Sequence, residues 1–185
     1  MLRHTRLNRG PEALLWAPLP FAAARSGPPP RTSGVLPHIQ LDQWPPPAIV
    51  ARLIDRSLQF PHVRARQSRM ASPETQALWV SDERALGPAE AFIDGLEFCH
   101  LHAAPEGSLH LTLPREVRPQ VLKLGWAELH LLVRAGFLPE SLVLVYAPRN
   151  DSELEIALRL VQISCQFAQG VYDRLRSPRR EAIHG

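Results

Sequence analysis

The chain has 185 residues, of which 45% are hydrophobic and 21% are charged. This composition is typical of one globular domain with extensions. The formal net charge is +3, but residues 47–170 carry 12 Lys and Arg against 14 Asp and Glu. Because a nucleic-acid-binding domain places its positive charge on the folded surface, we expect no nucleic-acid partner.

Neither a membrane span nor a cysteine-based metal site is predicted. No apolar stretch is long enough to cross a bilayer. Cys99 and Cys165 lack the paired spacing of a metal site, and both fall on apolar faces of predicted elements. Reduced cysteines fit a cytoplasmic location.

Proline divides the chain. Ten of the 19 prolines lie in the first 47 residues, and three-proline runs at 28–30 and 45–47 block helices and strand ladders. Residues 1–46 are therefore predicted to be a flexible, extended N-terminal extension. Residues 47–170 are predicted to be the folded domain, and residues 171–185 a basic C-terminal tail.

The domain alternates helical and strand patterns. A helix is predicted after Pro47 from the apolar spacing at Ile49, Val50 and Leu53. Alternating or apolar segments predict strands at 62–70, 76–81, 97–102, 108–113 and 141–146. A short helix is predicted at 116–124, and a long, broadly buried helix begins at Asn150, where Glu153 completes a capping-box pattern. The predicted class is α+β: an antiparallel sheet of about five strands with helices mainly on one face and a long C-terminal helix.

A hairpin carries the candidate site. With residues 103–107 as the loop, His102 faces Ser108 and His100 faces His110. Strand side chains alternate between faces, so these three histidines share one face, together with Phe98, while Leu109 and its neighbours line the core face. Opposed Cβ atoms lie about 5 Å apart, so three imidazoles converge on one ligand, proton or metal.

Three uses of these histidines remain open. They fit a metal site, with His100, His102 and His110 as the ligands if a metal binds, because three imidazoles with an open position form a known catalytic pattern. They also fit metal-free proton transfer, because histidine titrates near neutral pH. The structural alternative is a polar strand face without a chemical role.

Other candidates are less specific. Alternation places Glu97 on the core face, as a strand-end residue or as a partner that orients an imidazole. Trp126 is either a core anchor or a substrate contact. Arg149, close to a predicted helix N-terminus, is either an anion-binding residue or part of a surface ion pair. The sequence has no flavin or nucleotide motif and no serine-hydrolase motif.

Four segments together resemble the fungal luciferase family. They are Glu97–His102, Leu109–Leu113, Gly125–His130 and Tyr146–Asn150, and the similar region covers about residues 96–169. The resemblance implies functional roles for His100, His102, His110 and His130. It also implies substrate binding by Trp126, Tyr146 and Arg149.

The resemblance implies a small-molecule enzyme that needs no flavin. Fungal luciferases oxygenate a hydroxylated styryl-pyrone with molecular oxygen, so we expect an oxygenase-like reaction on an enolisable or hydroxypyrone-type ligand, with dioxygen as co-substrate. Ala127 stands where a glycine is common, and the loop after His130 departs from the family pattern; we therefore do not expect light emission. A metal-dependent enzyme and a non-catalytic binding module remain alternatives, and neither cofactor nor oligomeric state is fixed.

Overall fold

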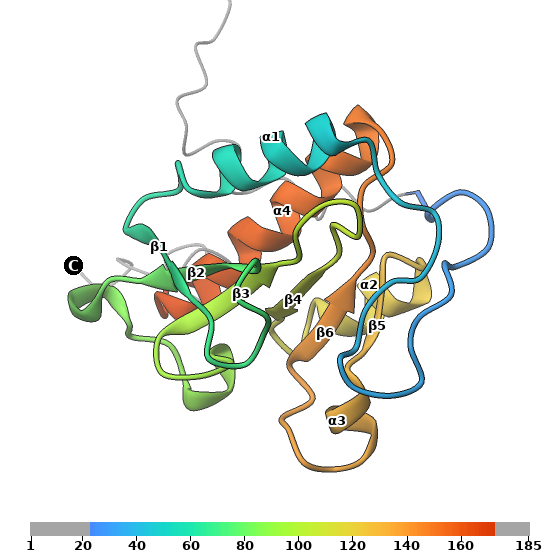
Figure 1. Ribbon diagram of the computed structural model, residues 1–185. Coiled ribbons are helices and arrows are strands. Elements are labelled where there is room, and N and C mark those ends of the chain that lie inside the picture. Colours follow the sequence, from blue (N-terminus) through green and yellow to red (C-terminus); the bar gives the residue numbers. More distant parts are fainter. Residues whose placement is uncertain (1–22, 173–185) are drawn as a thin grey trace, which may run out of the picture.

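The computed structural model describes residues 23–172 (Figure 1). Most of the predicted C-terminal tail and residues 1–22 lie outside this range. Six strands form one antiparallel sheet in the order β1-β2-β3-β4-β6-β5. The strands are β1 Val63–Gln67, β2 Gln76–Val80, β3 Glu97–Leu101, β4 Leu109–Thr112, β5 Ala127–Leu129 and β6 Leu142–Val145. The predicted α+β class is confirmed, with the three-residue β5 as an additional edge strand.

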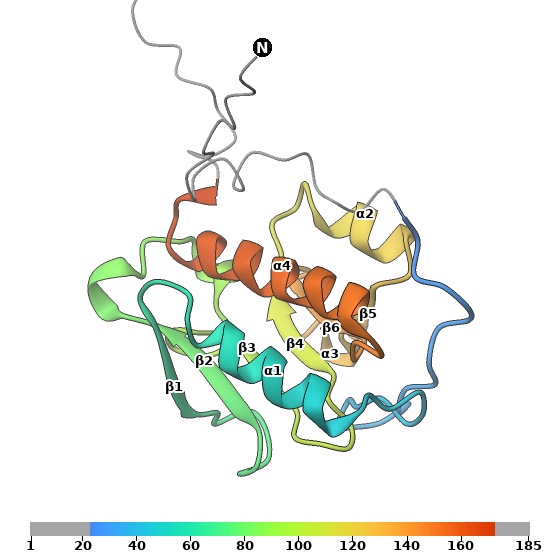
Figure 2. The ribbon, with the colours of Figure 1, turned by 90° about the horizontal axis from the view of Figure 1, so that it is seen from above.

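The helices cover mainly one face. Helix α1 (Pro47–Ser57) lies beside α4 (Asp151–Ala168), and both pack above the sheet (Figures 1 and 2). The shorter helices are α2 (Arg118–Lys123) and α3 (Leu131–Arg134). As predicted, Asn150 caps α4, because its side chain accepts a hydrogen bond from the Glu153 N–H at 3.0 Å. No helix among residues 23–172 is both long and apolar enough to cross a membrane.

The core lies between α4 and the centre of the sheet. Leu109 and Leu111 of β4 are fully buried, as is Val161 of α4. Each such side chain contributes about 1.5–3 kcal/mol through burial of apolar surface. Burial of these apolar side chains fixes the register of the hairpin formed by β3 and β4, and the opposite face of the hairpin carries polar side chains.

A β-bulge near the start of β3 changes the face of the sheet to which the side chains there point. Leu78 pairs with Cys99, but Trp79 pairs with Glu97, so Phe98 is an extra residue in β3. A bulge re-aims the side chains on either side of it. Phe98 is fully buried in the hydrophobic core and Glu97 bonds His100. The predicted facings of Phe98 and Glu97 were therefore wrong, because strict alternation does not pass through a bulge.

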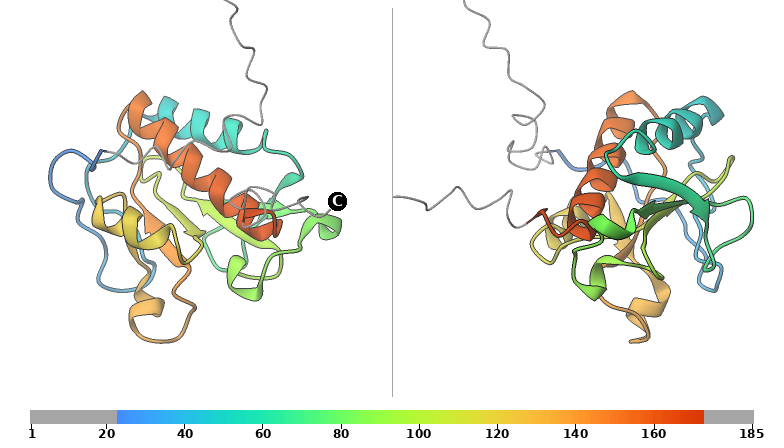
Figure 3. Two further views of the ribbon diagram at one scale, coloured as in Figure 1. Left: turned by 180° about the vertical axis from the view of Figure 1, so that it is seen from behind. Right: turned by 90° about the vertical axis from the view of Figure 1, so that its left-hand side faces the viewer.

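Residues 23–46, named here the N-terminal strap, run along the β5–β6 end of the sheet (blue in Figure 1; Figure 3). The strap has no helix and a single isolated bridge, Thr32–Gln40. Two contacts with the segment between β6 and α4 hold it: the Gln40 side chain accepts from the Ala147 N–H at 3.0 Å, and Arg149 donates to the Ser26 carbonyl at 2.8 Å. The Gln40 N–H also donates to Glu106 of the hairpin loop at 2.7 Å, and the His38 ring lies 5.7 Å from that of His110, so the strap lies over the polar face of the hairpin.

Candidate active site

Five imidazoles gather on the face of the sheet opposite α4. His100 lies in β3, His110 in β4, His102 just beyond β3, His130 immediately before α3, and His38 in the strap. The ring of His110 is central: its centroid lies 4.9 Å from those of His100 and His102, 4.7 Å from His130 and 5.7 Å from His38. The pairing of His100 with His110 confirms the predicted register. These five residues are the histidine cluster.

A hydrogen-bonded chain fixes the tautomers of two rings. The carboxylate of Glu97 lies 2.6 Å from His100 Nδ1, and His100 Nε2 lies 2.9 Å from His110 Nδ1. A carboxylate accepts, so His100 donates from Nδ1 and its neutral ring has a lone pair on Nε2. His110 must then donate from Nδ1, which leaves its Nε2 as a lone pair. Glu97 thus determines, through His100, which nitrogen of His110 carries the hydrogen and which keeps its lone pair.

A second carboxylate holds His102. Glu106, in the hairpin loop, accepts from His102 Nδ1 at 2.6 Å and from the Ser108 N–H at 3.1 Å through one oxygen. Its other oxygen accepts from the Ser108 hydroxyl and from the Gln40 N–H of the strap. His102 Nε2 is therefore an acceptor. This arrangement matches the carboxylate–imidazole pair of general-base sites.

A third carboxylate holds the histidine of the strap. His38 Nε2 lies 2.8 Å from Glu128 of β5, which also accepts from Arg134 at 3.0 Å. His38 therefore donates from Nε2, and its Nδ1 is a lone pair. His130 differs, because its Nδ1 accepts from the Leu132 N–H at 3.2 Å and caps α3.

The electrostatics keep the inner rings neutral. Burial lowers the pKa of His110 well below its ordinary value, and the neighbouring imidazoles add to this effect. Burial also lowers the pKa of His100, although Glu97 opposes the shift. The pKa of His130 falls to about 4, through burial and the nearby rings. Neutral rings present lone pairs that accept a proton or bind a cation.

The cluster opens into a cavity of about 830 Å³. One wall is polar and contains all five histidines. Apolar side chains line much of the remainder and come from the strap, the loop before β2, the segment before β3 and the region from α3 to β6: Leu36, Ile39, Met70, Ile93, Leu132, Leu138 and Leu142. The loop before β2 also contributes polar residues, among them Arg69 and Glu74. The size and mixed character are typical of a site for a small organic molecule.

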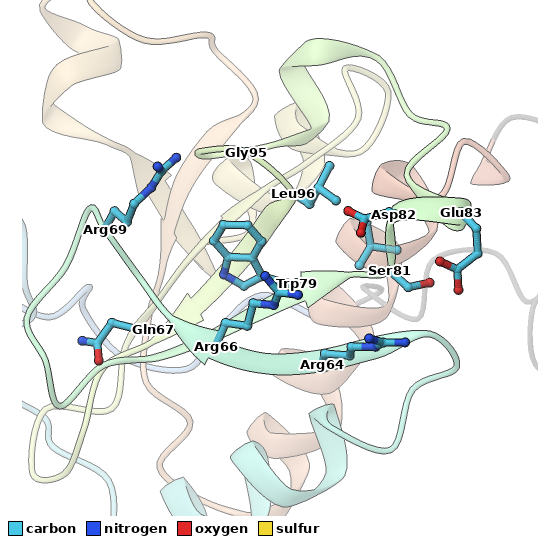
Figure 4. Close-up of a pocket in the computed structure, with 11 residues that line it drawn as sticks. Arg64, Arg66, Gln67, Arg69, Trp79, Ser81, Asp82, Glu83, Gly95 and Leu96 are labelled. Carbon is cyan, nitrogen blue, oxygen red and sulfur yellow. The ribbon is translucent and has the colours of Figure 1, made fainter.

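A separate hollow of about 540 Å³ lies beside Trp79 (Figure 4). Two of its three arginines are already engaged: Arg66 lies over the Trp79 ring at 5.4 Å, and Arg69 pairs with Asp94 at 2.6 Å. None of its lining residues is a histidine. The chemistry of the histidine cluster therefore belongs to the larger cavity.

The three predicted substrate-binding residues do not line the cavity of the histidine cluster. The Trp126 indole donates to the Ala23 carbonyl, and Arg149 pairs with Glu153. The Tyr146 hydroxyl lies 3.5 Å from Glu128, and burial with the nearby Glu128 carboxylate raises its pKa to about 12. Tyr146 thus reaches the cluster through the Glu128–His38 pair, and substrate contact by the three remains a prediction.

Three residues of the site were not predicted: His38, Glu106 and Glu128. Glu106 had a visible signal, because it lies four residues after His102 in the hairpin loop. His38 and Glu128 are 90 residues apart. Their pairing depends on the strap and on a very short strand, and neither leaves a periodic pattern.

Part of this chain is similar to known proteins. Residues 95–164, which contain four of the five histidines, match the family model described as Luciferase domain. The chain is 25% identical over 176 residues to a luciferase of Armillaria gallica, covering 86% of this chain and 65% of that protein. It is 34% identical over 73 residues to a luciferase of Neonothopanus nambi, covering 38% of this chain and 27% of that protein. No solved structure matches this chain.

The matched segment, residues 95–164, contains the hairpin and most of α4. The resemblance to the fungal luciferase family is confirmed by this family model and by the similarity to the fungal luciferases. The chain spans less than two thirds of the length of these relatives.

Proposed function

We propose that the chain is an oxygenase-like enzyme that acts on a hydroxylated, enolisable small molecule of the hydroxypyrone type. The observation that carries this proposal is the Glu106–His102 pair in the polar wall of a cavity that is also lined by apolar side chains. The apolar walls suit a flat aromatic body, and the imidazole wall suits its acidic hydroxyl group. The relationship to fungal luciferases supports the choice of reaction.

His102 is the proposed base. Its Nε2 takes the proton of the substrate hydroxyl group, and the imidazolium that forms is stabilised by the Glu106 carboxylate. The enolate carbon then forms a bond with dioxygen, so the substrate gives up two electrons and the oxygen molecule is reduced to a peroxide. His102 returns its proton to the outer peroxide oxygen, which balances the step as substrate plus O₂ giving a hydroperoxide.

Oxygen uptake by the full chain in the presence of hydroxypyrones tests this proposal. We expect His102→Ala to lower the rate by about 10²–10⁴-fold, the typical contribution of a general base. The matched control is His62→Asn, because His62 is an exposed histidine outside the cluster, with a positive φ that asparagine tolerates. An unchanged rate in His102→Ala would contradict the role of His102. Ligand-induced thermal stabilisation without oxygen uptake would favour a non-catalytic binding module.

A further inference from the structure

Two buried ring nitrogens of the histidine cluster carry lone pairs that no described residue satisfies. They are Nδ1 of His38 and Nε2 of His110. Both residues are well buried, with 1% and 6% of their surface exposed. The bonds to Glu128 and His100 place the ring hydrogens on the opposite nitrogens. The hydrogen-bonding network therefore leaves two buried acceptors, on rings whose centroids lie 5.7 Å apart, without a donor among the described residues.

Such an arrangement calls for an electron-pair acceptor. Buried polar atoms are almost always paired, and an unpaired one requires an explanation. One ring nitrogen from each of His38, His110 and His130 lies within 4.8 Å of the others, a spacing that suits three ligands around one cation. We propose that His38, His110 and His130 bind one divalent transition-metal ion.

The outer contacts support this assignment. Metal-binding histidines usually donate their other ring N–H to a carboxylate or a carbonyl group, which fixes the tautomer and aims the lone pair. His38 donates to Glu128 at 2.8 Å. His110 donates to His100, which in turn donates to Glu97, so a carboxylate backs this ligand through one intermediate ring.

His130 joins as the third ligand by giving up a weak bond. Its Nδ1 accepts from the Leu132 N–H at 3.2 Å, near the long end of the range for such bonds. Coordination through either ring nitrogen replaces this cap, so His130 should contribute less to affinity than His38 or His110. The three-imidazole set suits Zn, Fe, Cu or Ni, and leaves at least one position open.

The rival set of His100, His102 and His110 is also within 4.8 Å. Both nitrogens of His100 are already engaged, one with Glu97 and one with His110. Binding an ion there would break the contact that orients His110. The set that includes His38 needs no such loss at its two unsatisfied nitrogens.

The inference deepens the proposed function, and rests on it only for the identity of the ligand at the open position. An ion held by these residues faces the same cavity as His102. A deprotonated hydroxyl group of the substrate is an anionic oxygen donor, which suits a divalent ion. The strap would then supply both a metal ligand, His38, and part of the cavity wall.

Cobalt titration of the tag-free full chain, stripped with a chelator, tests the site without any substrate. The visible absorption of Co²⁺ reports inner-sphere ligands, and Zn²⁺ competition confirms a shared site. We expect one equivalent in the native protein and in His62→Asn. Affinity should fall at least 100-fold in His38→Ala and in His110→Ala. It should fall about 10–100-fold in Glu128→Gln, which keeps every ligand and removes only the carboxylate behind His38.

Far-UV circular dichroism and urea unfolding identify any variant that fails to fold, and Glu128→Gln then carries the test. The inference is overturned if the folded native chain binds neither Co²⁺ nor Zn²⁺. It is also overturned if His38→Ala binds Co²⁺ with the affinity of the native chain. A loss of Co²⁺ binding in His102→Ala but not in His38→Ala would be one such result. Oxygen uptake is measured separately, so failure of the metal site and failure of the proposed reaction are distinguishable.

Discussion

Replacing Glu106 with glutamine removes the carboxylate from the hairpin loop but keeps the shape of the side chain. The variant therefore distinguishes an acid–base role of Glu106 from a role in packing alone. The native carboxylate accepts four hydrogen bonds, from His102, from the Ser108 N–H and hydroxyl groups, and from the Gln40 N–H. Burial raises the pKa of Glu106, but these bonds outweigh burial and hold it below its ordinary value. Glutamine has the same shape but one oxygen instead of two.

The amide cannot satisfy all four donors in either orientation. If its NH₂ group faces Gln40, the Gln40 N–H loses its acceptor. If it faces His102, the Ser108 N–H loses its acceptor, and His102 must shift its hydrogen to Nε2. One orphaned backbone donor costs about 1–3 kcal/mol, and loss of the charge-assisted bonds raises the total to about 2–4 kcal/mol.

Two assays read this variant. Urea unfolding should show Glu106→Gln destabilised by about 2–4 kcal/mol, and oxygen uptake should fall by about 10²–10⁴-fold at a temperature where the variant is folded. The control is Glu90→Gln, because Glu90 is exposed and outside the cavity. Native-like stability together with native-like oxygen uptake in Glu106→Gln would refute the reasoning.

Three further outcomes follow from the burial and pairing of individual side chains. Phe98→Ala should destabilise the fold by about 3–5 kcal/mol in urea unfolding, because Phe98 is fully buried at the bulge; a cost below about 1 kcal/mol would contradict its core position. Burial raises the pKa of Glu153, but its bonds with Arg149 hold the pKa below the ordinary value. The ionised carboxylate therefore stabilises the fold above about pH 4.5, and this contribution is lost as the pH falls through the lowered pKa of the folded state, so the stability gap between native protein and Glu153→Gln should shrink from pH 7 towards acid pH; a gap that widens in acid would contradict this sign. Burial raises the pKa of Cys99 well above its ordinary value and that of Cys165 to about 12, so a thiol reagent should label both only after unfolding.

Local pattern was sufficient to predict the hairpin. Its apolar alternation, together with a turn of five residues, gave the pairing of His100 with His110 that the structure contains. That register places three histidines on one face whatever the rest of the chain does. Burial of Leu109 and Leu111 on the opposite face fixes it energetically.

The partners of those histidines depend on features without a local pattern. Glu97 bonds His100 because Phe98 is an extra residue in its strand, and a single inserted residue leaves no periodic signal. His38 is part of the site because the strap is held by contacts such as Gln40 to Ala147, which are 107 residues apart. Proline content predicts an extended backbone but carries no information about the surface on which that backbone lies.

The central claim is that the cavity lined by the histidine cluster carries out oxygenation, with His102 as the base. Mass spectrometry of the product formed from a hydroxypyrone under isotopically labelled dioxygen tests it most directly. The account predicts labelled oxygen in the product of the native chain and a loss of at least 100-fold in labelled product with His102→Ala. A product that carries no label, or labelling that is unchanged in His102→Ala, would contradict it.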